Sequence, residues 1–164
     1  MNLSISLDSD LGDKYYVYLA QLDGVFEDDL HYQKKGVEIY EVVLDRKSGD
    51  NKTNVRILSQ IVSFIAKQFL ANKNLILYYI CDDMNEIPTQ AHDLSPQAYR
   101  SRIFSALFER YVHLHNITNI IDTTISFKDA VGQYQYIHII SRDTQSSFVE
   151  ILEEFILTGY ASGK

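Results

Sequence analysis

Apolar and polar residues alternate with the period of a β-strand near both ends of the chain. Leu3, Ile5 and Leu7 alternate with polar residues, which is typical of a half-buried strand. Strands rich in tyrosine and β-branched residues are also predicted at 14–21, 36–45, 117–127 and 133–141. Turn-forming residues separate the last two, in the stretch Asp129-Ala130-Val131-Gly132, so these strands are expected to form a hairpin.

Between these strands the apolar spacing changes to that of a helix. The first helix is expected from Thr53 to Asn72, with Asn72 as a left-handed C-terminal residue. Its apolar stripe comprises Leu58, Ile61, Val62, Ile65 and Phe69. Ser95-Pro96 predicts the start of a second helix, because a capping hydroxyl precedes a proline in the first turn. The apolar stripe of this second helix comprises Phe104, Leu107, Phe108, Tyr111 and Leu114.

A third helix is predicted after possible caps at 143–146, and Gly159 is expected to end it. Its apolar stripe comprises Phe148, Leu152, Phe155 and Ile156. A continuous apolar run, Leu75 to Cys81, separates the first two helices and reads as a buried central strand. The order β-β-β-α-β-α-β-β-α predicts one α+β domain over 1–164, with a frayed tail at about 160–164. Its sheet should be mixed and mostly antiparallel, with helices mainly on one face.

Composition narrows the class of protein. Hydrophobic residues make up 46% of the 164 residues, which excludes a disordered chain. No apolar run reaches the roughly 20 residues of a membrane helix, and the N-terminus lacks the features of a signal peptide. Cys81 is the single cysteine, and at the end of an apolar strand it is expected to be a buried hydrophobe rather than a nucleophile. We expect a cytoplasmic protein of a bacterial type.

Negative charge is concentrated in the first third of the chain. Residues 1–50 carry a net charge of −6, out of −7 for the whole chain. Asp23, Glu27, Asp28 and Asp29 lie within seven residues and form a candidate partner surface. Such a surface repels phosphate backbones and attracts basic proteins, so we expect a protein partner and no nonspecific nucleic-acid binding. The alternative is that these acidic loops only keep the protein soluble.

A second candidate site joins the end of the central strand to the second helix. Asp82 and Asp83 follow the apolar run, and Arg100 and Arg102 lie in the first turns of the helix. The helix dipole disfavours positive charge there, so an aspartate is expected to compensate it. This arrangement predicts a structural ion pair between Asp82 and one of the arginines; the alternative is a small anion pocket.

No metal or cofactor is predicted. Asp82 and Asp83 could bind a divalent cation only with further ligands, for which Glu86 and Asp93 are the candidates. His113 and His115 are two residues apart on a predicted helix and so point in different directions, which argues against a zinc site that includes His92. The sequence contains no glycine-rich phosphate loop and no Gly-x-Ser-x-Gly turn.

The residues around this second site resemble a known family. Tyr79-Ile80-Cys81-Asp82, followed by Arg100-x-Arg102-x-Phe104-x-x-x-Phe108, is similar to the core pattern of small Bacteroidetes proteins catalogued as a domain of unknown function. The resemblance covers about 74–154, and this chain departs from the pattern by a long insert at 83–99. It implies an α+β domain of this size and implies no activity.

These observations favour a protein-binding module over an enzyme. The acidic first third and the lack of a complete catalytic set support this choice, and a role in immunity, as an antitoxin or in defence would suit the size and charge. The alternative is a small enzyme or anion-binding domain centred on Asp82, Asp83, Arg100 and Arg102. The oligomeric state is left open by the sequence.

Overall fold

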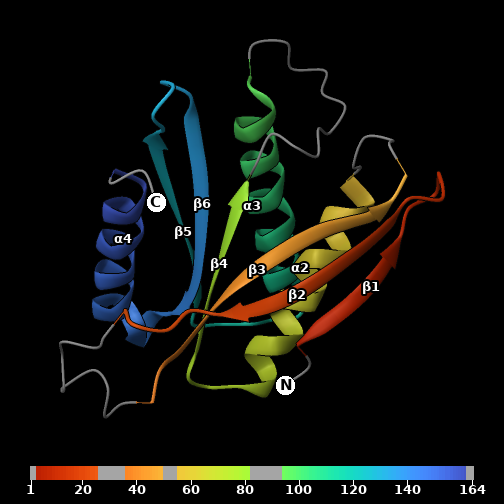
Figure 1. Cartoon of the computed structure of the whole chain (residues 1–164). Helices are drawn as coiled ribbons and strands as arrows, with labels where there is room; N and C mark the ends of the chain where they lie inside the picture. Colours follow the sequence, from red (N-terminus) through yellow and green to blue (C-terminus); the bar gives the residue numbers. More distant parts are fainter. Residues whose placement is uncertain (1–2, 26–35, 50–54, 82–93, 162–164) are drawn as a thin grey trace.

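The computed structural model describes residues 3–25, 36–49, 55–81 and 94–161. The strands form a six-stranded sheet in the order β1-β2-β3-β4-β6-β5 (Figure 1). The strands are β1 (Ser4–Asp8), β2 (Lys14–Gln21), β3 (Glu38–Ser48), β4 (Leu75–Cys81), β5 (Ile120–Lys128) and β6 (Tyr134–Arg142). The helices are α2 (Val55–Ala71), α3 (Pro96–Leu114) and α4 (Ser146–Ala161), with a short 3-10 helix η1 (Asp143–Gln145) before α4. The predicted α+β class and element order are confirmed.

Antiparallel pairing dominates the sheet. Neighbouring strands are antiparallel in the β1–β2, β2–β3, β4–β6 and β5–β6 pairs, whereas β3 and β4 are parallel and are connected through α2. β4 lies between β3 and β6 and is therefore an interior strand, as its continuous apolar sequence predicts. β6 lies between β4 and β5. The sheet therefore ends in β1 on one side and β5 on the other.

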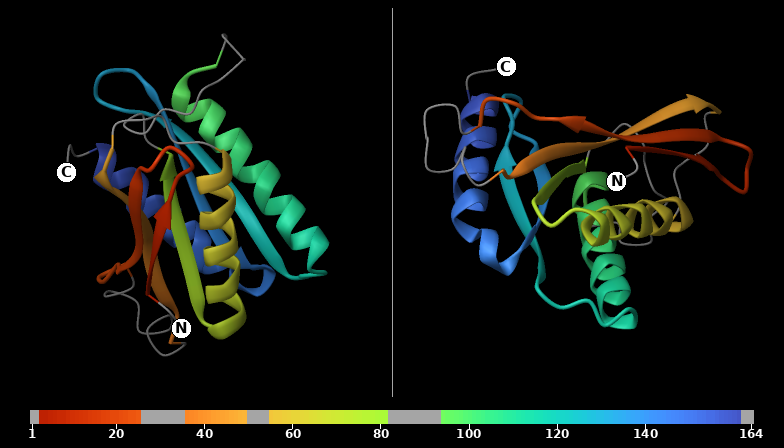
Figure 2. Two further views of the ribbon diagram at one scale, coloured as in Figure 1. Left: turned by 90° about the vertical axis from the view of Figure 1, so that its right-hand side faces the viewer. Right: turned by 90° about the horizontal axis from the view of Figure 1, so that it is seen from below.

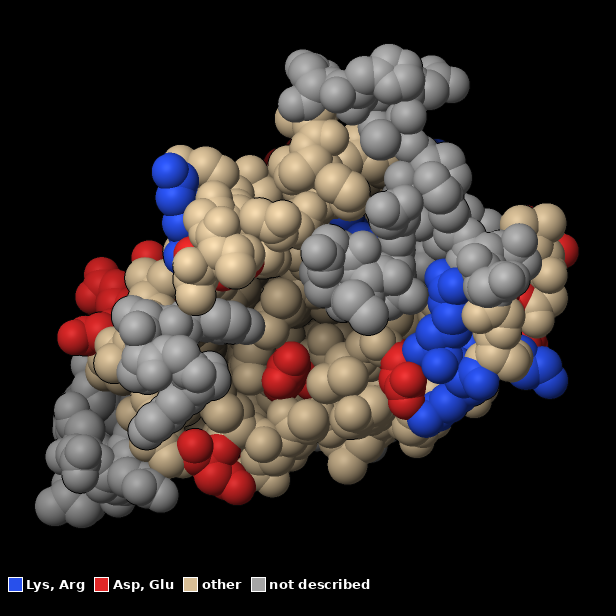
Figure 3. Space-filling view, turned by 45° about the horizontal axis from the view of Figure 1, so that its top comes forward, with Lys and Arg blue, Asp and Glu red and all other residues tan. Residues whose placement is uncertain are grey.

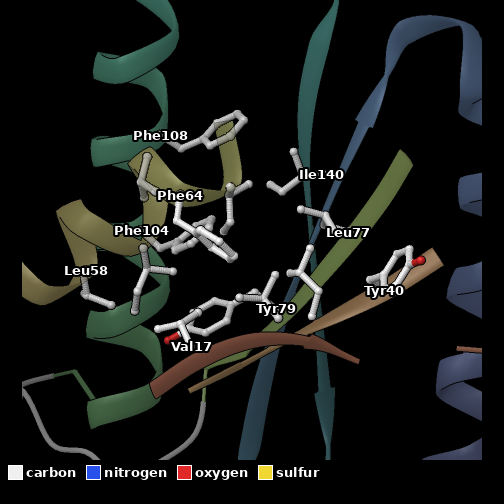
Figure 4. Close-up of a cluster of buried hydrophobic side chains, with 14 of the residues drawn as sticks. Val17, Tyr40, Leu58, Phe64, Leu77, Tyr79, Phe104, Phe108 and Ile140 are labelled. Atoms are coloured by element: carbon white, nitrogen blue, oxygen red, sulfur yellow. The ribbon is translucent and has the colours of Figure 1, made fainter. Parts of the chain in front are cut away.

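Helices cover both faces of the sheet. α2 and α3 lie on one face and α4 on the other, which confirms the prediction that the helices are mainly on one face (Figure 2). On the first face, Phe64 and Phe104 of the helices meet Leu77 and Tyr79 of the central strand (Figure 4). The second cluster packs α4 against the opposite side chains of the same strands, including Ile76 and Ile139. Alternation along the strands thus supplies two cores.

Helix ends follow the predicted chemistry at one end and depart from it at two others. The Ser95 hydroxyl accepts a hydrogen bond from the Ala98 N–H at 3.2 Å, as expected of a cap. Asn72 is not left-handed, contrary to prediction; its side-chain oxygen instead accepts from the Asn74 N–H at 2.9 Å. The prediction that Gly159 ends the last helix is also wrong, since α4 continues to Ala161.

The predicted apolar stripes are mostly buried, with one exposed member in each of α3 and α4. All five stripe residues of α2 are at most 1% exposed. In α3, Phe104 and Phe108 are buried, but Leu114 is 63% exposed because the last turn of the helix extends beyond the core. Phe155 of α4 is 42% exposed, while its neighbour Ile156 is buried. Spacing therefore predicted most of the buried positions, whereas Leu114 lies past the core and Phe155 lies at the margin of the buried face of α4.

Candidate functional site

The predicted acid–base site is only partly within the described residues. Asp82 and Asp83 lie outside them. Arg100 is 1% exposed, whereas Arg102 is exposed, because two residues along a helix are about 200° apart. The arginines thus occupy different sides of α3, which does not favour a pocket formed by both. Pairing of Asp82 with either arginine stays a prediction.

The acidic partner surface is also only partly described. Asp23 is exposed, and Glu27, Asp28 and Asp29 lie outside the described residues. On the face seen in Figure 3, acidic side chains are spread over several places and basic side chains gather mainly on the right. The described part of this face therefore carries mixed charge rather than one acidic patch.

The metal ligands and nucleophiles considered from the sequence lie only partly within the described residues. His113 and His115 are both exposed near the end of α3, and His92, Glu86 and Asp93 lie outside the described residues. Among the residues that the structure describes, no group of three or more His, Cys, Asp and Glu side chains could hold a metal. Cys81 is fully buried, as predicted for a small core residue.

A buried polar network lies where α3 packs on β5 and β6, and sequence reasoning missed it. His138 of β6 is 0% exposed. Its Nε2 lies 2.8 Å from the Ser101 hydroxyl, and its Nδ1 lies 2.8 Å from an oxygen of Asp122. The Ser105 hydroxyl donates to Asp122 at 3.0 Å, and the Thr124 hydroxyl lies 3.3 Å from Nδ1. The network thus connects one helix to both strands of a hairpin.

The connectivity of this network is that of a serine nucleophile, a histidine base and an orienting aspartate. The order of solvent exposure along the network does not suit catalysis, because the serine is more buried than the aspartate. A nucleophile must face the substrate, but Ser101 is 5% exposed, whereas the Asp122 side chain is 10% exposed and Thr124 is exposed on the edge strand. Since the serine lies at the covered end, the arrangement suits a structural contact that holds α3 on the sheet.

One feature of the sequence could have indicated this network. His138 interrupts an apolar strand, and a polar residue on a buried strand needs a partner. Asp122 and Ser101 are 16 and 37 residues away from it, so only the β5–β6 register and the helix placement identify them as those partners.

A groove with a volume of about 510 Å³ separates the edge strand β1 from α2. Its lining residues are Ile5, Leu7, Gln60, Ser63, Phe64, Lys67, Gln68 and Ala71. Leu7 and Phe64 are nearly buried and form an apolar floor, while Lys67 is exposed. Gln60 Oε1 is a buried acceptor that receives no hydrogen bond from the described residues. The groove therefore combines apolar surface with an unused acceptor and a cation.

The backbone of β1 has one side available beside this groove. The Leu19 N–H of β2 donates to the Leu3 carbonyl at 2.8 Å, so odd-numbered residues of β1 direct their backbone groups to β2. By alternation, Ser6 and Asp8 direct theirs outward, where the sheet has no further strand within the described residues. The outward backbone of Ser6 and Asp8 thus lies beside an apolar groove.

Comparison with known proteins adds no further information. The chain matches no protein-family model, no curated protein and no solved structure. The resemblance to the Bacteroidetes family stays a prediction. No helix in the described part of the chain combines the length and apolar character needed to cross a membrane.

Proposed function

We propose that this protein is a binding module that takes an extended segment of another protein as an additional strand on β1. The observation that carries the proposal is the position of an apolar groove beside the outward backbone of Ser6 and Asp8, along which no further strand pairs within the described part of the chain. In strand addition, backbone hydrogen bonds supply affinity, and pockets for alternate side chains supply specificity. The β1–α2 groove has both elements, since Ile5 and Leu7 belong to the strand whose edge is free.

Among the devices that usually prevent such pairing, β1 has only one, the charged side chain of Asp8 at its end. Its sequence, Ser-Ile-Ser-Leu-Asp, contains no proline, lysine or bulge. Self-association through β1 belongs to the same binding mode and is excluded or detected by measuring the mass of the free protein in solution.

The acidic segment that includes Asp23 keeps its proposed role in steering a basic partner. A cytoplasmic location is kept as a proposal that rests on the apolar runs, the N-terminal sequence and the single cysteine, and an immunity, antitoxin or defence role as one that rests on size and charge. The alternative of an enzyme centred on Asp82, Asp83, Arg100 and Arg102 has less support, because Arg100 and Arg102 occupy different sides of α3.

A pair of proline substitutions tests strand addition. Ser6→Pro removes an outward N–H of β1, and Ser126→Pro does the same on β5, where the pairing of Asn119 with Asp143 likewise directs even-numbered residues outward. Both serines are exposed. Proline is tolerated on an edge strand when its missing N–H would face solvent, so both variants are expected to fold.

The probe is a displayed library of random ten-residue peptides, selected on the wild-type protein. Selected peptides are expected to bind Ser6→Pro at least about tenfold more weakly, since loss of one or more backbone hydrogen bonds costs about 1.4 kcal/mol or more. Their affinity for Ser126→Pro should stay within about twofold of wild type. The proposal is wrong if no sequence is enriched, or if Ser6→Pro binds like the wild type.

A further inference from the structure

We propose that the segment bound in the β1–α2 groove carries an apolar side chain followed, toward Ala71, by a carboxylate that pairs with Lys67. This inference rests on the proposed strand addition and specifies the chemistry of the partner. The geometry that carries it is the alignment of α2 with β1 and the distribution of charge along the groove.

The two walls of the groove run in opposite directions. Near the start of α2, Arg56 forms an ion pair with Asp10, which follows β1. Moving from Arg56 to Lys67 advances the helix by roughly 16 Å, and roughly five strand residues cover the same distance. Counting back from Asp10, Lys67 lies about level with Ile5, which lines the same groove. The end of the groove at Arg56 is therefore already neutralised, and the end at Lys67 is not.

Apolar surface occupies the floor of the groove. Phe64 and Leu7 are 4% and 5% exposed, and Ile5 beside them is half-buried. Leu3 continues the same alternation and is 48% exposed. A strand paired with β1 directs alternate side chains to this face, so an apolar side chain there would cover the part of Ile5 and Leu3 that water now contacts and would extend the floor formed by Leu7 and Phe64.

Two polar groups of α2 determine which polar groups the bound segment must carry. Lys67 is exposed and makes no ion pair within the described residues, so it is available to a carboxylate. Gln60 Oε1 is buried and receives no hydrogen bond from the part of the chain that the structure describes, and a donor on the incoming segment would satisfy it. Both residues line the groove from the same helix and lie two turns apart. The groove thus selects for charge at one end and for a donor nearer the other.

The same chemistry could come from two sources. A carboxylate can belong to an Asp or Glu side chain within the segment, or to the free C-terminus of the partner. Either source lies about one groove-facing position beyond the apolar side chain, because side chains that share a face of a strand are about 6.6 Å apart.

The test uses the selected peptides and three variants of the full chain. Lys67→Met removes the cation and keeps most of the apolar stem, whereas Lys67→Glu reverses the charge. Lys73→Met is the matched control, because Lys73 is exposed beyond the end of α2 and does not line the groove. Each peptide is synthesised with its acidic residue changed to the amide and, separately, with an amidated C-terminus.

We expect Lys67→Met to weaken binding by about fivefold or more at low salt, Lys67→Glu to weaken it further, and Lys73→Met to leave it within about twofold. One of the two modified peptides should bind the wild type more weakly than the unmodified peptide does, and should bind Lys67→Met as well as the unmodified peptide does. The group that was changed in that peptide is the source of the carboxylate. The inference is wrong if Lys67→Met binds all peptides like the wild type. If Ser6→Pro still abolishes binding in that case, strand addition stands and only the carboxylate is rejected.

Discussion

The two edge hairpins of the sheet are built alike at their turns and differently on the face toward the helices. In both turns the first residue donates its N–H to the carbonyl four residues later, at 2.8 Å from Ser9 and 2.9 Å from Asp129. Each turn places a glycine at positive φ, Gly12 at 85° and Gly132 at 81°, where a side chain would be strained. The two edge hairpins therefore have similar turns, although their edge strands face different helices.

The difference lies in the side chains that face α2 and α3. On β5, Asp122 points inward and is bound by His138, and Ser101 of α3 completes the contact. On β1, Ile5 and Leu7 face α2 across an open groove. An inward-pointing charge is one way in which proteins make a strand edge unsuitable for pairing. We therefore propose that the inward-pointing Asp122 disfavours strand pairing at the β5 edge, which we call the closed edge, and that the β1 edge, which we call the open edge, accepts a partner strand.

The largest effect should come from removing the aspartate of the closed edge. Asp122→Ala leaves His138 and Ser105 without their acceptor, so we expect the free energy of unfolding to fall by about 2–4 kcal/mol in urea titration. Glu150→Ala, which removes an exposed carboxylate from α4, is the control and should change little. An unchanged midpoint in Asp122→Ala would mean that this network does not stabilise the edge.

A second prediction concerns two adjacent positions of the open edge. Ile5→Pro removes an N–H directed to β2 and should cost about 2–3 kcal/mol, whereas Ser6→Pro should cost less than about 1 kcal/mol. Thermal or urea unfolding of the two variants measures the difference. Equal losses would show that the outward direction assigned to Ser6 is wrong.

A third prediction concerns pH and the turn of the β5–β6 hairpin. Hydrogen bonds from the Gln135 side chain and from the Gln133 N–H hold the pKa of Asp129 below its ordinary value. A lowered folded-state pKa stabilises the fold above the unfolded pKa, and this contribution is lost as pH falls through the folded value. Wild type should therefore lose more stability than Asp129→Asn on acidification below about pH 4. Identical pH profiles would remove this role for Asp129.

The smallest effect is expected at the neutralised end of the groove. Arg56 and Asp10 are about 60% exposed, so Arg56→Ala should cost at most about 0.5 kcal/mol. Peptide affinity should also change little, since the proposed carboxylate lies at the opposite end. A large loss of affinity in Arg56→Ala, with Lys67→Met unaffected, would reverse the direction assigned to the bound segment.

Local patterns were sufficient to predict the elements and the class of fold. The spacing of Leu58, Ile61 and Ile65 identified the buried face of α2 because burial follows the helical period. The continuous run from Leu75 to Cys81 identified the interior strand, because a strand covered on both faces needs apolar side chains at successive positions. Helix ends were less predictable, as Asn72 and Gly159 show, because a residue suited to ending a helix need not adopt that conformation.

The functional surfaces depend on strand order, which periodicity does not reveal. Insertion of β6 between β4 and β5 places His138 beside Asp122 and leaves β5 as an edge strand. The groove at β1 depends equally on where α2 lies against a strand that is about fifty residues away in sequence. Ile5 and Lys67 carry no local signal of a shared site, so only the tertiary arrangement brings them together.

Hydrogen exchange at the two edges tests the central claim most directly. With a selected peptide at saturation, the amides of Ser6 and Asp8 should exchange at least about tenfold more slowly, because they would now donate to an added strand. The outward amides of Thr124 and Ser126 on β5 should exchange at their unbound rates. Unchanged exchange at Ser6 and Asp8 in the bound protein, or protection that appears on β5 instead, would contradict the account.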